Sequence, residues 1–294
     1  MFPLLIEQLI NGLALGGVYA LVAVGFSLIF GVLRLFHISH GDVFMFSGYI
    51  VVTLVGAIGQ LPLIAILPIG IVVGAFIGFL VERTAFKPFR KSNEIIPLIS
   101  GIGISLILQN LAMIIWGPEQ YSFNLGADLG WIEFGNIRIT GIRIVILLSS
   151  VILVLIFNYW LFRTRTGRAV RATAIDPITA SMMGIKPDRI ITITFLVGSA
   201  LAGAATVLVG ALYGAIYPSL GFSIGLKAFA ASILGGLGSM SGAVLGGLIL
   251  GVLEVATAGY VNVAYQDAIA MGILILVLLL RPNGILGKSM EEKL

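Results

Sequence analysis

Apolar stretches of membrane-crossing length dominate this chain. They run over approximately 5–32, 43–58, 63–82, 95–116, 143–162, 189–212, 242–258 and 265–281. A helix needs roughly 20 apolar residues to cross the hydrocarbon core of a bilayer. Only 10% of the 294 residues are charged and the mean hydropathy is +1.12, whereas soluble domains carry about 25% charge. We therefore predict an all-α, polytopic integral membrane protein with about eight transmembrane helices. A soluble enzyme and a nucleic-acid-binding protein are excluded.

We expect a single transmembrane domain over 1–294. A shorter apolar stretch, 226–237, precedes the seventh span and is too short to cross alone. We interpret it as a half-helix, which a membrane tolerates only where protein buries it or where it lines a cavity. The N-terminus carries Glu7 and no basic residue before the first span, which is typical of a transmembrane helix rather than a cleaved signal peptide. The chain has no cysteine, which excludes disulfides and thiolate metal ligands.

Lysine and arginine residues gather in a few segments, and this predicts the orientation. We expect 14 of the 17 on one side of the membrane: Arg34, Arg83, Lys87, Arg90, Lys91, Arg163, Arg165, Arg168, Arg171, Lys186, Arg189, Arg281, Lys288 and Lys293. Arg138, Arg143 and Lys227 are expected on the opposite side. Basic loops are enriched on the cytoplasmic face. The sequence therefore predicts a multi-pass protein of a cytoplasmic membrane, with its C-terminus inside and its N-terminus outside.

Glycine is unusually frequent, at 38 residues, and it recurs at small-xxx-small spacing. Examples are Gly12/Gly16, Gly70/Gly74/Gly78, Gly210/Gly214, Gly242/Gly246 and Gly247/Gly251. This spacing lets helix backbones approach closely in lipid, where hydrophobicity gives no net drive between helices. Such stripes pack helices within one chain or face a second subunit, and the pattern alone does not separate the two.

Two histidines three residues apart, His37 and His40, precede Asp42. At helical spacing these side chains could share a face, as metal ligands do. However, Gly41 interrupts the helix and the sequence offers no other ligand cluster. We therefore expect no metal site and favour a polar break between the first two spans, facing a cavity or an internal partner.

The long basic loop, 163–189, contains a short helix signature. Asp176 is a good N-cap and Pro177 fits the first helical position, while Gly184 suits the C-terminal stop. Ile178, Met182 and Ile185 could share one apolar side. A two-turn helix is marginal alone. It is either a knob that docks into a partner or a helix packed against the bundle or the membrane interface.

No site for chemistry of its own is found in the sequence. The tail from Pro282 to Ser289 has proline where a phosphate-binding loop requires its first glycine. ATP binding by this chain is therefore rejected, and no cofactor is expected. The sequence also lacks a nucleophile–base pair, which disfavours an intramembrane hydrolase, and a buried charge relay, which disfavours an ion-coupled secondary transporter.

The chain resembles the LivH-type permease subunit of branched-chain amino acid ABC importers in four places. These are Asn11–Gly25 in the first span, the Ser-His-Gly-Asp motif at 39–42, the segment 167–185, and Gly235–Gly247 together with Arg281–Gly284. The family commonly has asparagine at the position of His37 and proline at that of Ser241. The first departure leaves the substrate less certain, whereas the second lies in a turn or broken helix.

The resemblance implies an assembly. A second permease subunit would pair with this chain in the lipid membrane, two ATP-binding cassette subunits would dock on the cytosolic side and bind the ATP, and an extracytoplasmic binding protein would deliver the substrate. By position, the coupling element comprises Asp176, Pro177, Ala180, Gly184 and Ile185. Arg168 and Arg171 contact either the ATPase or lipid phosphates.

We therefore expect a permease subunit for branched-chain or similar hydrophobic amino acids, without enzymatic activity. The alternatives are a related ABC permease for urea, amides or other amino acids and, less favoured, the secondary transporter. Polar residues in or beside the spans are the candidates for the substrate path, because each needs a partner or a cavity. They are Asn11, Tyr19, Ser27, His40, Gln109 and Asn110. Each of these side chains either forms its hydrogen bonds with a neighbouring helix or contacts the substrate.

Overall fold

The protein is an α-helical bundle with a very small amount of strand. The computed structural model describes residues 2–59, 61–90, 92–93, 95–123, 130–134 and 137–287. Among these residues, eight helices are long and apolar enough to cross a membrane, as predicted. They are α1 (Phe2–Leu33), α2 (His40–Ile58), α3 (Leu63–Val81), α4 (Ile95–Trp116), α5 (Gly141–Arg163), α8 (Pro187–Tyr213), α10 (Met240–Tyr260) and α11 (Gln266–Leu280), the last lengthened by the turn Val263–Tyr265.

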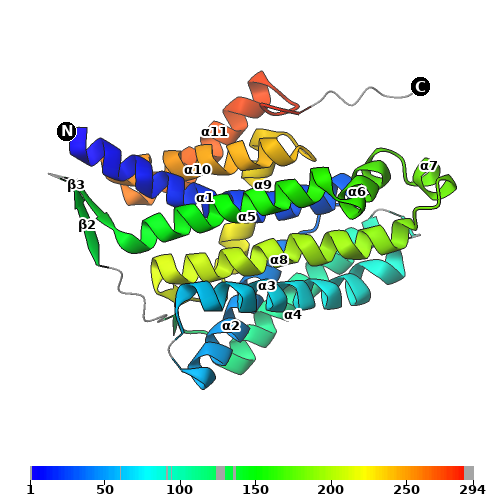
Figure 1. The fold of residues 1–294 in the computed structure, drawn as a ribbon, viewed down its shortest axis with the longest axis horizontal. Coiled ribbons are helices and arrows are strands. Elements are labelled where there is room, and N and C mark those ends of the chain that lie inside the picture. The colour runs from blue at the N-terminus through cyan, green and yellow to red at the C-terminus, as the bar shows by residue number, and fades with distance from the viewer. Residues whose placement is uncertain are drawn as a thin grey trace.

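The shorter elements mark the two ends of the bundle. The hairpin of β2 (Trp131–Phe134) and β3 (Ile137–Thr140) lies at one end, here called the hairpin end (Figure 1). The helices α6 (Arg165–Ile175) and α7 (Pro177–Met182) lie at the other, here called the α7 end. A second antiparallel pair joins β1 (Tyr121–Ser122) to β4 (Ala215–Ile216). The chain turns after α3 through a π-helical segment, Glu82–Phe86, and a 3-10 turn, Lys87–Phe89.

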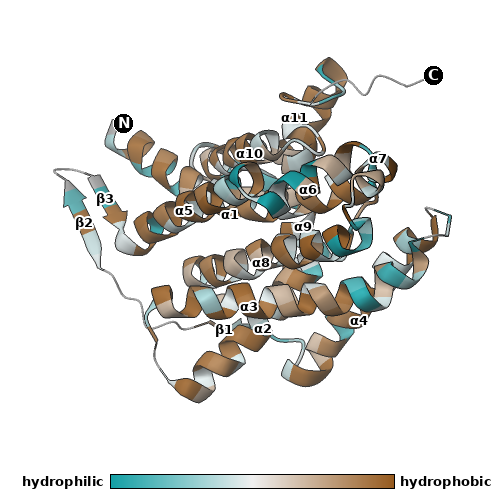
Figure 2. Cartoon of the chain, turned by 45° about the vertical axis from the view of Figure 1, so that its right-hand side comes forward, coloured by the Kyte–Doolittle hydropathy of each residue, from teal (hydrophilic) through white to brown (hydrophobic). Residues whose placement is uncertain are grey.

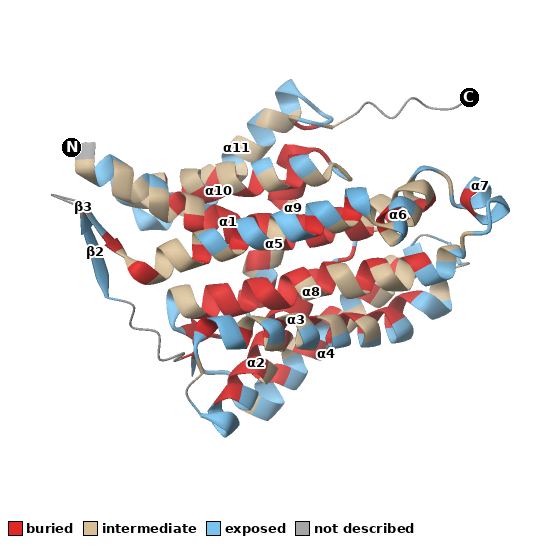
Figure 3. Cartoon of the chain, viewed as in Figure 1, coloured by how far each residue is buried: buried red, intermediate tan, exposed pale blue. Residues whose placement is uncertain are grey.

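The long helices run between these two ends. At the hairpin end, the backbone N–H of Arg138 donates to Glu7 Oε1 of α1 at 2.7 Å. At the α7 end, Arg34 follows α1 and its Nη2 donates to the carbonyl of Ala174 in α6 at 3.2 Å. α1 therefore extends through the whole bundle, and 94% of its most apolar window is buried. It is a central helix, and α8 beside it is also mostly buried (Figure 3).

As predicted, the stretch before the seventh span forms an apolar helix shorter than the candidate spans: α9 (Leu220–Gly235) has 16 residues and begins earlier in the sequence than expected. Its last residues pair with the segment after α11, where Ile285 N–H donates to the Leu234 carbonyl at 2.9 Å. α9 carries the chain from the strand β4 after α8 to the start of α10. α9 is not among the eight helices long enough to cross a membrane. Lys227, expected on the outer side of the membrane, is buried within α9.

Apolar surface faces outward along the helices, and polar residues gather at the α7 end (Figure 2). Inside the bundle, glycines set the helix spacing. A Cβ placed on Gly70 of α3 would lie 2.5 Å from the carbonyl oxygen of Gly203 in α8, and one on Gly251 of α10 would lie 2.3 Å from the Cα of Gly16 in α1. These stripes therefore pack helices within one chain, which resolves that alternative for these positions.

We predict that Gly74→Ala destabilises the bundle. Its Cβ would lie 2.4 Å from the carbonyl oxygen of Ser199 and 2.7 Å from the Cα of Gly203, and overpacking of this kind costs about 1–3 kcal/mol. Thermal unfolding in detergent should show a lower midpoint. Gly103→Ala in α4 is the matched control, because nothing lies within 4 Å of its Cβ position and alanine is the better helix former. Equal midpoints for the two variants would contradict the packing.

Candidate functional site

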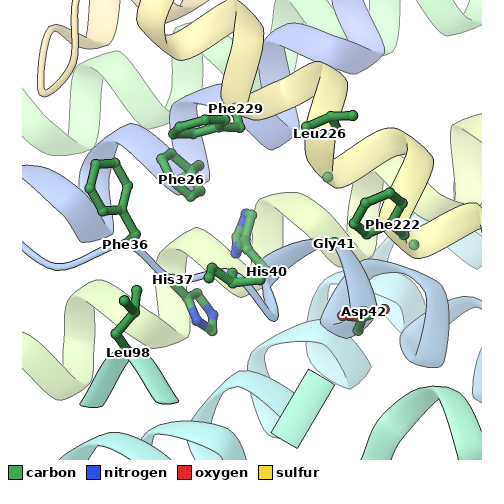
Figure 4. A pocket seen from close by; sticks show the side chains of 13 residues that line it. Phe26, Phe36, His37, His40, Gly41, Asp42, Leu98, Phe222, Leu226 and Phe229 are labelled. Atoms are coloured by element: carbon green, nitrogen blue, oxygen red, sulfur yellow. The ribbon is translucent and has the colours of Figure 1, made fainter. Parts of the chain in front are cut away.

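One pocket of about 280 Å³ opens on the flank of the bundle near the start of α2. Its wall is built from the end of α1, the connection 34–39, the first turn of α2, the start of α4 and α9 (Figure 4). Pockets for drug-sized ligands span roughly 300–1,000 Å³, so this cavity suits a smaller molecule. It lies between segments that are far apart in the sequence.

Aromatic rings form much of the pocket wall. Phe229 of α9 contacts Phe26 of α1 edge to face, with ring centroids 5.4 Å apart, and Phe36 of the connection in the same way at 5.6 Å. Phe222 and Leu226 extend the apolar wall along α9. These α9 residues are spaced four and three apart, so one face of the helix presents all three to the cavity. The arrangement offers an apolar surface that fits an aliphatic or aromatic group.

The polar part of the pocket comes from the break between α1 and α2. His37, His40 and Asp42 all line the cavity. His37 lies between Phe86 and Phe195, with ring centroids 5.0 and 4.9 Å away, and its Nδ1 is 3.2 Å from Ser39 Oγ. Burial lowers the pKa of His37 well below its usual value, so the ring is neutral at pH 7. Among the described residues, no group of three or more potential ligand side chains could hold a metal ion.

Asp42 is held by α4. Its carboxylate accepts hydrogen bonds from the Ser105 hydroxyl and, at 2.9 Å, from Gln109 Nε2. It also lies in the first turn of α2, where a negative charge is favoured by the helix dipole. Asp42 is only 2% exposed. This carboxylate therefore joins α2 to α4 directly beside the cavity.

The structure separates the polar residues that the sequence suggested for a path. His40 lines the pocket. Gln109 does not line it, but it donates a hydrogen bond to Asp42, which does. Three others bond elsewhere: Tyr19 to Glu254, Ser27 to the backbone N–H of Gly238, and Asn110 to the Leu106 carbonyl of its own helix. Asn11 is half-buried on α1 and does not line this pocket.

The sequence placed Asp42 in the polar break but not among the candidates for the substrate path, and it missed the phenylalanines as pocket residues. The Ser-His-Gly-Asp motif was a signal for Asp42, because an acid beside a span needs a partner or a cavity. The spacing of Phe222, Leu226 and Phe229 was a signal for one apolar face. It could not be assigned to a cavity, since any buried helix shows the same pattern.

A second feature of interest is α7, at the far end of the bundle. The Asp176 side chain accepts from the Ile178 N–H at 2.9 Å and from the Thr179 hydroxyl, so it caps the helix as expected. Gly184 has φ +83°, a conformation that favours glycine, and it ends the turn. Ala180 is the buried residue of α7.

The outer side of α7 is apolar and exposed. Ile178, Met182 and Met183 are 70%, 81% and 80% exposed. Ile185, which was expected on the same side, instead packs against the core, because the chain reverses at Gly184. Arg168 is exposed on α6. Exposed methionines form an adaptable apolar surface, and the helix α7 that carries them lies at the end of the bundle (Figure 3).

The fold and these two features define a multi-pass α-helical membrane protein, with a pocket between its helices and an exposed apolar helix at one end. The family model described as "Branched-chain amino acid transport system / permease component" matches residues 8–278. The chain belongs to this family, and the resemblance seen in the sequence motifs is confirmed.

Relatives match over almost the full chain. The high-affinity branched-chain amino acid transport system permease protein BraD of Pseudomonas aeruginosa is 41% identical, over 98% of this chain and 97% of its own length. LivH of Escherichia coli, a high-affinity branched-chain amino acid transport system permease protein, is 38% identical over 99% and 98%. A probable branched-chain amino acid transport permease protein of Methanocaldococcus jannaschii is 32% identical over 92% and 89%.

We predict that Asp42→Ala loosens the pocket. It leaves the Ser105 hydroxyl and the Gln109 amide without their acceptor, and an unsatisfied buried donor costs about 1–3 kcal/mol. The unfolding midpoint in detergent should fall. The midpoint of Asp42→Asn should lie between those of the parent and Asp42→Ala, because one acceptor oxygen remains. Asn110→Ala on the same helix is the control, since Asn110 is exposed and bonds only within α4. A midpoint unchanged in Asp42→Ala would contradict the role assigned to the carboxylate.

Proposed function

We propose that this chain is a permease subunit of an ATP-driven importer for branched-chain or similar hydrophobic amino acids. The observation that carries the proposal is the similarity over nearly the whole chain to permeases named for branched-chain amino acid transport. The geometry agrees with it, because the apolar pocket of about 280 Å³ can hold an aliphatic side chain. In this proposal the chain is no enzyme and needs no cofactor or metal of its own.

The pocket is proposed as this subunit's part of the passage. It is open on the flank of the bundle, where Phe222 and Leu226 are 62% and 42% exposed and Ile38 is 43% exposed. A hydrophilic ammonium or carboxylate group cannot pass through lipid here without a partner surface. We therefore propose that a second permease subunit covers this flank and completes the passage. His37, His40 and Asp42 are the polar groups that this chain contributes.

The ATPase subunits are proposed to dock at the α7 end. The exposed side of α7 presents Ile178, Met182 and Met183, and an apolar helix of this kind fits a partner's groove. Asp176, Pro177, Ala180 and Gly184 shape this coupling element, Ile185 anchors it to the core, and Arg168 lies on the adjoining helix. ATP would be bound by these partner subunits. Their movement would reach the bundle as a rigid-body displacement of α6 and α7.

The proposed orientation follows the basic residues. Arg34, the segment after α3, α6 with α7, and the segment after α11 carry most of the positive charge, and cytoplasmic loops are enriched in it. The α7 end would then face the cytoplasm. The hairpin end would face outward in a cytoplasmic membrane, where an extracytoplasmic binding protein delivers the substrate.

Uptake by the complete transporter tests this proposal. Co-expressed with its partner subunits, the chain should support ATP-dependent accumulation of labelled leucine, isoleucine and valine, and little accumulation of urea. Accumulation of urea instead would favour the related permease class. Accumulation of leucine by the chain alone in vesicles, driven by an ion gradient, would favour the secondary transporter and overturn the proposal.

The docking role is tested in the same assay. Met182→Asp together with Met183→Asp should abolish leucine uptake, because two charges would enter an apolar groove without partners. Membrane insertion should be unchanged, since both side chains are exposed. Met182→Leu with Met183→Leu is the matched control and should retain uptake. Normal uptake in the aspartate variant would rule out docking through this surface.

A further inference from the structure

A buried cation lies on the side of α9 that faces away from the pocket. Lys227 Nζ contacts Glu254 Oε1 of α10 at 2.7 Å and Asp267 Oδ1 of α11 at 3.0 Å. The Lys227 and Glu254 side chains are 11% and 5% exposed. Tyr19 of α1 donates its hydroxyl to Glu254 Oε2 at 2.9 Å. Four helices therefore meet at one ionic cluster, which we call the Lys227 cluster.

Ionisable groups at membrane depth are costly and are retained where they serve a function. The pocket does not include the Lys227 cluster, and the two lie on different faces of α9. With 3.6 residues per turn, Lys227 is rotated by about 140° from Phe222 and about 160° from Phe229. The same helix thus carries the apolar pocket wall on one face and the buried cation on the other.

The pocket side of α9 packs directly against the backbone of α2. A Cβ on Gly41 of α2 would lie 2.1 Å from the Gly221 carbonyl oxygen and 2.7 Å from the Cα of Gly225. The C-terminal end of α9 packs equally closely, because a Cβ on Gly235 would lie 1.9 Å from the Gly242 carbonyl oxygen of α10. Glycine contacts set the distance between backbones, but they give no directional bond that fixes rotation. Two side chains of α9 supply directional bonds to its neighbours: Lys227 through its ion pairs, and Ser232, whose hydroxyl donates to the Ala23 carbonyl of α1 at 3.0 Å. Lys227 lies within the pocket-lining stretch 222–229, whereas Ser232 lies beyond it.

We propose that Lys227 is a positioning residue for the pocket. Its bonds to Glu254 and Asp267 fix the rotation of α9, so that Phe222, Leu226 and Phe229 face the cavity while Gly221 and Gly225 stay against Gly41. Tyr19 orients the shared carboxylate. The role of this cluster in uptake rests on the proposed function, whereas its role in positioning α9 does not.

The absence of cysteine from the chain gives a direct test. Ala228→Cys places a thiol on a part of α9 that is 1% exposed, so its reaction with a small maleimide in the assembled transporter should be slow. The double substitution Lys227→Met/Glu254→Gln removes the ion pair without leaving one buried charge alone. It should raise the labelling rate at Ala228→Cys about tenfold, the factor that corresponds to 1.4 kcal/mol. The single substitution Lys227→Arg keeps a cation beside Glu254, so Ala228→Cys should label as slowly in that background as in the parent.

Two controls separate positioning from general loosening. A thiol at Ala204→Cys in α8, a position that is 0% exposed, should label slowly in every background. Glu82→Gln/Arg90→Met removes a second ion pair, which joins the end of α3 to the turn that follows it and does not line the pocket. It should leave labelling at Ala228→Cys unchanged. If the Lys227→Met/Glu254→Gln background labels both thiols faster, or neither, the proposal is wrong.

Uptake kinetics test the link to the pocket. In the complete transporter, Lys227→Met/Glu254→Gln should raise the KM for leucine about tenfold with a maximal rate within about twofold of the parent, because binding is impaired more than the transport step. Faster labelling at Ala228→Cys with an unchanged KM would overturn the role in the pocket. If the parent transporter does not carry leucine, the proposed function fails, and the labelling result still decides the positioning role.

Discussion

Direct contact between helix backbones is the constraint on which this structure depends. α3 meets α8 at Gly70 and Gly203, and α2 meets α9 at Gly41 and Gly221. In each pair a single Cβ would overlap a backbone atom of the partner helix. Lipid gives helices no hydrophobic drive to associate, so close van der Waals contact must provide much of the attraction. The glycine content of this chain is therefore a packing requirement.

The few buried charges complement these contacts. Asp42 joins α2 to α4, Glu82 joins α3 to the turn at Arg90, and Glu254 joins α10 to α9 through Lys227. Each carboxylate has a polar partner on another element, as an apolar environment requires. These bonds and the glycine contacts leave one flank with an apolar pocket and one end with an exposed helix. A transporter needs both: a site for its substrate and a surface that receives movement.

The sequence alone could predict the membrane class and most span boundaries, because long apolar runs carry that information locally. It also predicted α7, since Asp176, Pro177 and Gly184 act on their own backbone. It could not predict that Lys227 is buried, because the partner Glu254 is 27 residues away and on another helix. For the same reason the sequence could not show that Tyr19 bonds to Glu254 and Ser27 to Gly238, since both partners are more than 200 residues away. Whether a polar side chain in a span faces a cavity or a neighbour depends on helix rotation, which only the packed bundle determines.

The length of α9 was also beyond local reasoning. Its first turns contain glycine, which is a poor helix former, and the helix is held there by the close approach of Gly221 to Gly41. Tertiary contact therefore overrides the weak local preference.

Photolabelling with a diazirine analogue of leucine, in the complete transporter, tests the central claim most directly. Mass spectrometry of the labelled chain should locate the adducts in 26–42 and 221–229 or at Leu98, which together enclose the pocket, and excess leucine should prevent them. Adducts confined to other faces of the bundle, such as the first turns of α1 or the length of α5, would contradict the account.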